Sequence, residues 1–337
     1  MIKVGLIGVG YMGKTHGACY EELYKEGVRI TAVADLVDSN IKEAVKKYGA
    51  KAYKDGMDLI ANADVDIIDI CLPTYLHSEH AIAAMKQNKG VFIEKPVCLN
   101  KEEGKALLET EKETKAKVMV GHCIRLWSEY MWLKEVVDNN TYGKVVTGVF
   151  KRISASPTWS WNNWLHQPNL SGSVALDMHI HDVDYVRYIM GEPTKVNAVA
   201  SRDKKGVIQQ MFSTYQYDDA LIKAEVCWNY PSGFPFAMEY RVKLEKATVV
   251  YDSNAQPTLT VYLNEGGSFN PVLNKDFEGD NDKGGNVSSL GGYYSELKYF
   301  IDQYKNNEDI KIAPLSEGVK SVLLALKEID KAGGMEK

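Results

Sequence analysis

Two residues spaced four apart in the second half of the chain, Asp177 and His181, are suited to moving a proton. On a helix this spacing puts both side chains on one face. An imidazole accepts a proton near neutral pH, and a carboxylate one turn away orients it or binds a neighbouring hydroxyl group. Lys95, directly before Pro96, adds an ammonium that stabilises negative charge on an oxygen. We predict that Lys95, Asp177 and His181 are catalytic; the competing interpretations are a solvated surface lysine and a polar helix start with ordinary capping.

The segment around His181 also contains ligand types for a metal ion, at Asp177, His179, Asp182 and Asp184. Residues two apart on a helix point about 200° apart. His179 and His181 therefore cannot share one ion while the helix is intact, and we predict no metal site.

These side chains need a scaffold, and the start of the chain indicates which one. The apolar run Ile2–Ile7 ends at a G-x-G-x-x-G motif of Gly8, Gly10 and Gly13, and a helical pattern follows. A strand, this motif and a helix form the dinucleotide-binding fingerprint. Gly8 permits a tight turn, Gly10 lets the backbone approach a pyrophosphate, and Gly13 lets the helix pack on the strand. The amides at the helix start suit an anion.

Asp35 follows the next apolar strand, Ile30–Ala34, where a carboxylate binds the ribose 2′-hydroxyl of a dinucleotide. The same carboxylate repels a 2′-phosphate, and no arginine follows it. We therefore predict NAD as the cofactor, in preference to NADP.

Strands and helices alternate over about the first 120 residues, which predicts an α/β Rossmann domain with a doubly wound parallel sheet. In such a sheet ligands lie outside the carboxyl ends of the strands. Glycine-rich or polar segments at these ends are predicted to surround one crevice. They are Gly8–Gly13, Asp35, Pro73-Thr74, Glu94-Lys95-Pro96 and His122–Arg125.

From about residue 143 the pattern changes to successive strands, which predicts an α+β domain with an open, mainly antiparallel sheet of meander type. One helix is expected near 177–190 and two more near 293–305 and 316–331. We predict a Rossmann domain over 1–122 and a substrate-binding and oligomerisation domain over 123–337, with the final helices as candidates for packing back on the first. Residues 264–292, rich in Gly, Asn and Asp, predict a long loop.

The composition argues against several classes of partner. The 337 residues carry 40 Lys plus Arg and 45 Asp plus Glu, a net charge of −5, with no basic cluster. We expect no nucleic-acid and no membrane partner, since the apolar runs are also shorter than a span. The first strand begins at residue 2, which predicts no signal peptide. The five cysteines form no C-x-x-C pair, so we predict free thiols and a cytoplasmic location.

The chain resembles the Gfo/Idh/MocA oxidoreductases, named for glucose–fructose oxidoreductase, inositol dehydrogenase and a rhizopine-catabolism protein. The resemblance covers nearly the whole length. It rests on Gly8–Gly13, Pro73-Thr74 with His77, Glu94-Lys95-Pro96, Arg125, and Asp177-x-x-x-His181. Ser173 departs from the pattern, because many members carry a second glycine after Gly172.

The resemblance implies a bound nicotinamide cofactor, a sugar, inositol or related polyol as substrate, and a homo-oligomer (dimer or tetramer) formed through the C-terminal sheet. It implies that Lys95 and His181 are catalytic and that Asp177 is catalytic or substrate-binding. The predicted cofactor-binding residues are Gly8, Gly10, Tyr11, Met12, Gly13, Asp35, Leu36, Leu72, Pro73, Thr74, His77, Glu94 and Lys95. The predicted substrate-binding residues are Lys95, His122, Arg125, Trp161, Asp177 and His181, with Tyr293 as a further candidate.

A cluster of tryptophans, Trp159, Trp161 and Trp164, has two interpretations. Indole faces stack on the C–H side of a sugar, which would make this loop a wall of a polyol site. Alternatively, the indoles are buried and pin the loop.

The main hypothesis is NAD-dependent hydride transfer between nicotinamide and a secondary alcohol or ketone of such a polyol. Two alternatives stay open. In the first, NAD oxidises a sugar carbon transiently and so promotes elimination, hydrolysis or epimerisation with no net redox change. In the second, the protein is a non-catalytic NAD-binding regulator, which has no need of a lysine and histidine pair.

Overall fold

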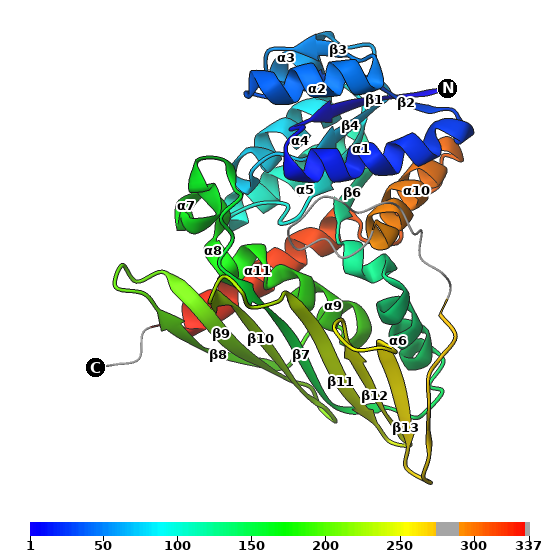
Figure 1. Cartoon of the computed structure of the whole chain (residues 1–337), viewed down its shortest axis with the longest axis vertical. Helices are drawn as coiled ribbons and strands as arrows, with labels where there is room; N and C mark the ends of the chain where they lie inside the picture. Colours follow the sequence, from blue (N-terminus) through cyan, green and yellow to red (C-terminus); the bar gives the residue numbers. More distant parts are fainter. Residues whose placement is uncertain (274–289, 334–337) are drawn as a thin grey trace. The chain divides into compact units, whose positions relative to one another are not determined.

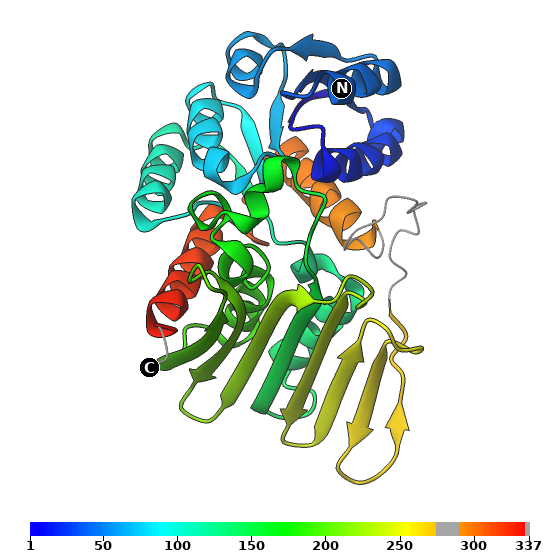
Figure 2. The same ribbon diagram turned by 60° about the vertical axis from the view of Figure 1, so that its left-hand side comes forward.

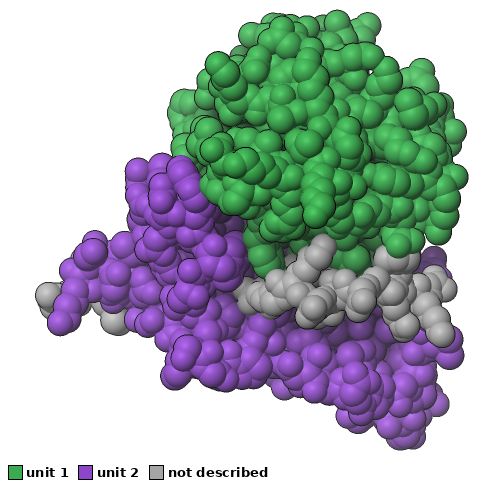
Figure 3. Space-filling model, turned by 45° about the horizontal axis from the view of Figure 1, so that its top comes forward, with its two compact units in different colours: residues 1–126, 276–282, 288–320 green, residues 127–275, 283–287, 321–337 purple. Residues whose placement is uncertain are grey.

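The computed structural model describes residues 1–273 and 290–333, and these divide into two compact units, coloured separately in Figure 3. Of the described residues, the first unit contains 1–126 and 290–320, and the second contains 127–273 and 321–333. Among the helices in these ranges, none combines the length and the apolar composition that crossing a bilayer requires.

The first unit is built on a six-stranded parallel sheet in the order β3-β2-β1-β4-β5-β6 (Figure 1). The order reverses beside β1, as in a doubly wound fold, so the predicted fold class is confirmed. The strands are β1 Ile2–Ile7, β2 Val28–Ala34, β3 Lys51–Tyr53, β4 Ile67–Ile70, β5 Gly90–Glu94 and β6 Val118–Gly121. The helices are α1 Tyr11–Leu23, α2 Asp38–Tyr48, α3 Gly56–Asn62, α4 His77–Lys86, α5 Lys101–Thr114 and α10 Gly291–Lys305.

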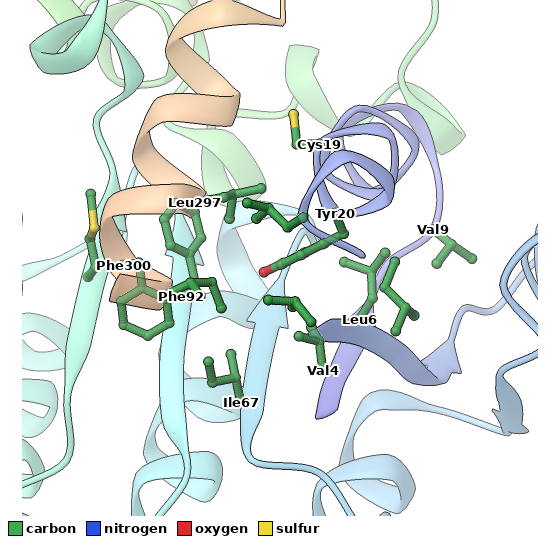
Figure 4. Close-up of a cluster of buried hydrophobic side chains, with 14 of the residues drawn as sticks. Val4, Leu6, Val9, Cys19, Tyr20, Ile67, Phe92, Leu297 and Phe300 are labelled. Carbon is green, nitrogen blue, oxygen red and sulfur yellow. The ribbon is translucent and has the colours of Figure 1, made fainter. Parts of the chain in front are cut away.

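The core of this unit joins residues that are far apart in the sequence. Helix α10 packs against α1 and contacts β5 and β6. Figure 4 shows Leu297 and Phe300 of α10 beside Phe92 of β5, with Tyr20 of α1 pointing into the same cluster. The rings of Phe92 and Phe300 meet edge to face with centroids 5.7 Å apart, a favoured aromatic geometry. Helix α10 is therefore part of the core that covers the sheet formed by the first 121 residues.

The second unit is built on an eight-stranded sheet in the order β14-β13-β12-β11-β7-β10-β9-β8, and Figure 2 shows these strands fanned out. The strands are β7 Val145–Ala155, β8 Lys195–Arg202, β9 Ile208–Gln216, β10 Leu221–Tyr230, β11 Ala237–Leu244, β12 Ala247–Asp252, β13 Leu259–Leu263 and β14 Ser268–Phe269. The helices are α6 Ser128–Asp138, α7 Pro168–Ser171, α8 Ser173–Asp177, α9 Ile180–Met190 and most of α11 Leu315–Lys331.

The mainly antiparallel sheet is confirmed, but the simple meander was wrong at one position. Strand β7 lies between β10 and β11 and runs parallel to β10. The reason is that helices intervene between β7 and β8, so the chain returns at the far edge of the sheet. Three hairpin-connected strands then bring β10 alongside β7 in the same direction.

The predicted helix near 177–190 was also wrong at its start. Asp177 is the last residue of α8, and α9 begins at Ile180. Between them the amide of His179 bonds to the Val174 carbonyl oxygen at 3.1 Å, one residue further back than in a regular α-helix. In the predicted loop, β14 occupies Ser268–Phe269; residues 274–289 lie outside the described residues.

Candidate functional site

The turn between β1 and α1 has the geometry that the glycine motif requires. Gly8 has a φ of +82°, and a Cβ there would lie 2.5 Å from the Cys71 carbonyl oxygen. A Cβ on Gly13 would collide with the Gly8 carbonyl oxygen. A Cβ on Gly10 would meet no atom within 4 Å, so the turn is open at the start of α1. Backbone amides at an open helix start suit a pyrophosphate.

Asp35, directly after β2, is tied to this turn. Its Oδ2 accepts a hydrogen bond from the Val9 amide at 2.9 Å, and its Oδ1 accepts one from the Val37 amide at 2.7 Å. The carboxylate thus braces the glycine turn, a contact that the sequence pattern does not show. Leu36 beside it is exposed.

The segment after β4 carries Thr74 and His77, both buried. The hydroxyl oxygen of Thr74 meets no hydrogen-bond partner among the described residues, as a group that awaits a ligand does. The His77 ring lies between two backbone carbonyls, with Nδ1 2.7 Å from the Pro96 oxygen and Nε2 2.7 Å from the Leu72 oxygen. Burial lowers the pKa of His77, and the ring joins the ends of β4 and β5.

Glu94 and Lys95 stand at the carboxyl end of β5, and the Lys95–Pro96 peptide bond is cis. The Glu94 carboxylate accepts a hydrogen bond from the Lys95 amide at 3.0 Å and lies 3.1 Å from Nε2 of His16. Burial alone would raise the pKa of Glu94, but the hydrogen bond and charge of His16 outweigh it and the pKa lies below its ordinary 4.5. Lys95 is half-buried.

Sequence reasoning missed three buried residues behind Glu94: His16, Asp69 and Glu296. Nδ1 of His16 lies 2.9 Å from Asp69, and ligand atoms of His16, Glu94 and Glu296 lie within 4.8 Å of one another. Asp69 in the otherwise apolar run Ile67–Ile70 is a signal that could have indicated such a cluster. Glu296 offers no comparable signal, because its partners His16 and Glu94 lie roughly two to three hundred residues earlier in the chain.

In the second unit, Asp177 and His181 flank the turn that separates α8 from α9. Met178 (φ −94°, ψ −36°) and His179 (φ −67°, ψ −29°) keep right-handed helical angles, so the i, i+4 relation survives the break. Asp177 and His181 are half-buried, whereas His179 is fully buried. The two histidines thus differ in their surroundings: His181 borders the surface of its unit and His179 belongs to the core.

His179 is held by the last helix and by the sheet. Its Nε2 lies 2.7 Å from Glu328 Oε2 of α11, and the Ser213 hydroxyl of β9 donates to the same Glu328 oxygen at 2.6 Å. Next to this turn, the Arg152 guanidinium of β7 donates to both oxygens of Asp182 at 3.1 Å. The turn between Asp177 and His181 is therefore fixed from both sides.

The tryptophan loop supports both of its interpretations, at different residues. Trp164 packs against the core of the second unit, as a pinning indole would. Trp159 and Trp161 are exposed, by 44% and 46%, as side chains on the wall of a site would be. In the first unit, His122 and Arg125 are buried, and the Tyr293 ring lies 6.4 Å from that of His16.

The structure brings most of the predicted cofactor-binding residues to the carboxyl end of one sheet. Lys95 belongs to the first unit, and Asp177, His181 and Trp161 belong to the second. Their meeting at one substrate stays a prediction.

Comparisons with known proteins agree with this architecture. Residues 2–122 match the profile described as the oxidoreductase family, NAD-binding Rossmann fold, and residues 130–250 match the GFO/IDH/MocA C-terminal domain. Myo-inositol 2-dehydrogenase of Thermotoga maritima is 35% identical over 193 residues. That match covers 57% of this chain and 55% of the relative, so it spans little more than half of either protein.

Two solved structures extend the likeness to nearly the whole chain. A probable dehydrogenase from Thermotoga maritima has a TM-score of 0.80 at 26% identity, covering 98% of this chain and 96% of that one. Levoglucosan dehydrogenase in complex with NADH and levoglucosan has a TM-score of 0.84 at 20% identity, covering 98% and 97%. This second likeness shows the fold.

Proposed function

Because this chain belongs to the Gfo/Idh/MocA oxidoreductase family, we propose that it transfers a hydride between NAD and a secondary alcohol or ketone of a sugar, an inositol or a related polyol. The observation that carries the proposal is the glycine turn, where Gly10 faces open space at the start of α1. The names of the relatives, an inositol dehydrogenase and a levoglucosan dehydrogenase, support this substrate class.

The residues around the turn suit the cofactor. NAD, when bound, supplies the carbon that accepts or returns the hydride. The amides at the start of α1 would bind the pyrophosphate, the Asp35 carboxylate the ribose, and the Thr74 hydroxyl a further polar group. Gly8, Gly13, Tyr11, Met12, Leu36, Leu72, Pro73, His77 and Glu94 complete the proposed site.

We propose NAD rather than NADP because the Asp35 carboxylate would oppose a 2′-phosphate. Titration of the protein with NADH and with NADPH, followed by nicotinamide fluorescence, measures the difference. NADH should bind at least about tenfold more tightly, which corresponds to about 1.4 kcal/mol. Equal affinities would contradict this part of the proposal.

The proposed chemistry places charge where the reaction develops it. In the oxidative direction, the neutral imidazole of His181 takes the hydroxyl proton while the carbinol carbon gives up its hydride. The Lys95 ammonium stabilises the oxygen as negative charge builds, and Asp177 holds the imidazole or a neighbouring hydroxyl. His122, Arg125 and Trp161 are the proposed further contacts of the substrate. This mechanism needs no metal ion.

The direct test incubates the protein with NAD and a panel of inositols, hexoses, pentoses and keto sugars while the absorbance of reduced nicotinamide is recorded. Accumulating NADH supports net oxidation. Product that forms without NADH would assign the transient-oxidation chemistry instead. If no compound reacts and a partner protein binds only with NAD present, the protein is a regulator and the dehydrogenase proposal is wrong.

We further propose a homo-oligomer formed through the second sheet, in the cytoplasm. Val199 of β8 and Leu221 of β10 are 63% and 52% exposed and alternate with buried neighbours, so they lie on the face away from the core. Light scattering on the eluting protein should give a multiple of 37.7 kDa. A monomer mass at micromolar concentration would exclude a stable oligomer.

A further inference from the structure

A buried charge cluster lies behind the carboxyl end of β5. His16 of α1 is fully buried, with Nδ1 2.9 Å from Asp69 Oδ2 and Nε2 3.1 Å from Glu94 Oε1. The second carboxylate oxygen of Glu94 accepts the hydrogen bond from the Lys95 amide at 3.0 Å. One carboxylate therefore joins a core histidine to the backbone of the proposed catalytic lysine.

The geometry favours a cationic His16. Both ring nitrogens face carboxylates, and only an imidazolium donates through both. Burial alone would lower the pKa of His16, but the charge of Asp69 and the hydrogen bond to it outweigh burial, and the pKa lies well above its ordinary 6.5. Cys71 Sγ lies 3.2 Å from Nδ1, so His16, Asp69 and Cys71 together resemble a set of metal ligands. A ring protonated at both nitrogens has no lone pair with which to bind a metal.

A third acid completes the cluster without adding charge. Glu296 of α10 is fully buried, and neither of its oxygens has a hydrogen-bond partner among the described residues. Burial, followed by the nearby Glu94 carboxylate, raises the pKa of Glu296 well above its ordinary 4.5, which favours the neutral carboxyl. The other titratable groups that interact with these three residues are Asp69, Cys71, His77, Lys95 and Tyr293.

We propose that His16 is a positioning residue for hydride transfer: its imidazolium keeps Glu94 ionised and holds the carboxylate against the Lys95 amide, which fixes the direction in which the Lys95 side chain leaves β5. The inference rests on the proposed function through the role of Lys95. Without the cation, only the charges of Lys95 and His77 oppose the desolvation of the buried Glu94 carboxylate, so the pKa of Glu94 rises. The acceptor for the Lys95 amide is then weakened.

Two substitutions separate the hydrogen bond of His16 from its charge. In H16N the shorter amide stays near the place of Nδ1, so it keeps Asp69 as a partner and loses Glu94. In H16Q the longer amide reaches the place of Nε2 and donates a neutral hydrogen bond to Glu94. Neither side chain carries a charge.

The pH profile of turnover tests the proposal. At pH 7 the kcat of H16N should fall about tenfold to a hundredfold, the range for a lost hydrogen bond to a charged group. It should recover as the pH rises and Glu94 ionises, and H16Q should show a smaller loss with the same pH dependence. A loss that is the same at every pH would indicate a merely structural role and overturn the proposal.

Three further variants serve as references. E94Q should lose turnover at every pH, and the double variant H16N/E94Q should lose no more than E94Q and show no recovery at high pH. H80N is the matched control, since His80 is a buried histidine of α4 whose Nδ1 faces the Leu76 carbonyl oxygen at 2.9 Å. It should keep the kcat and the pH profile of the wild type.

A spectroscopic measurement on the full chain without cofactor needs no turnover. With the seven histidines labelled with ¹⁵N, the signal that H16N lacks belongs to His16. It should show two protonated nitrogens from pH 6 to 9. With ¹³C-labelled glutamate, the chemical shift of the Glu94 carboxyl carbon should be that of an ionised carboxylate at pH 7 in the wild type and of a partly protonated carboxyl group in H16N. A neutral His16 at pH 7 would overturn the inference. An absence of polyol turnover with these signals as expected would defeat the proposed function while leaving the charge state of His16 established.

Discussion

Each unit of the molecule contains a fully buried histidine beside a carboxylate, and the two differ in the number of acids. In the first unit, His16 lies between Asp69 and Glu94, and Glu296 adds a third carboxyl. In the second unit, His179 meets a single acid, Glu328. Its other hydrogen-bonding neighbours, Ser213 and Tyr215, are neutral hydroxyl groups.

This difference separates two uses of the same pair of residue types. Where carboxyl groups outnumber cations in a buried site, desolvation and like charge favour a proton on one of them, so the ionisation of each depends on the others. The first cluster can therefore set the charge of Glu94. A pair with one acid and one base mainly fixes the position of the backbone that carries it. His179 is part of the turn between Asp177 and His181. The second cluster is accordingly a brace.

The largest expected effect concerns His181, which flanks the turn that the second cluster holds. H181A should lower turnover by about 10²–10⁴-fold, the range for a lost general base, while NAD affinity stays near that of the wild type. Steady-state kinetics and a cofactor titration measure both quantities. Turnover close to that of the wild type would show that His181 is not the general base. The second cluster would then support the fold and not the reaction.

The next effect is on folding. E328A leaves His179 and Ser213 buried without their shared partner, and the free energy of unfolding should fall by about 3–5 kcal/mol, as for a broken buried pair. The matched control is D330A, on the exposed side of the same helix, which should change it by less than about 0.5 kcal/mol. Urea unfolding measures both. A loss below 1 kcal/mol in E328A would show that the pair is no brace.

An effect with a distinctive pH dependence is expected in the first cluster. The pKa of Glu296 is raised in the folded chain, so the folded state holds a proton that the unfolded state releases above about pH 4.3. The wild type therefore loses stability as the pH rises above that value, by up to about 1.4 kcal/mol per pH unit until the folded-state pKa is reached. E296Q lacks this loss. It should gain stability relative to the wild type between pH 5 and 8, and a difference that is constant with pH would mean that Glu296 is ionised.

The smallest effect lies in the segment that leads into the second cluster. Ser173 has a φ of +56°, a left-handed conformation that glycine adopts without strain. S173G should raise the free energy of unfolding by up to about 1 kcal/mol, since relief of that strain exceeds the added flexibility of the unfolded chain only slightly. The readout is again urea unfolding. Destabilisation would show that the serine side chain contributes more than its backbone costs.

Local patterns in the sequence predicted much of this architecture. The glycine turn and the alternation of strands and helices that makes the parallel sheet are visible in short stretches of sequence. The short elements β3 and α3 were missed because three to seven residues carry too little periodicity. The turn that divides α8 from α9 was missed because distant residues, Glu328 among them, hold it.

The candidate site divides in the same way. The predicted residues are those whose types and spacing are typical of cofactor and substrate sites. Their roles as cofactor and substrate ligands remain predictions. His16, Asp69 and Glu296 stayed hidden because nothing in their immediate neighbours connects them; only the packing of α1, β4 and α10 brings them together. A buried charge cluster is a property of the assembled fold.

The place of α10 also bears on how the protein is made. Strand β5 leaves the ribosome about two hundred residues before Phe300, the residue that covers Phe92. Because translation adds about 5–20 residues each second, the nucleotide-binding sheet waits on the order of ten seconds or more with that apolar flank bare. All six strands of this sheet are made before α10, so the packing of this face has to wait for a helix from near the end of the chain.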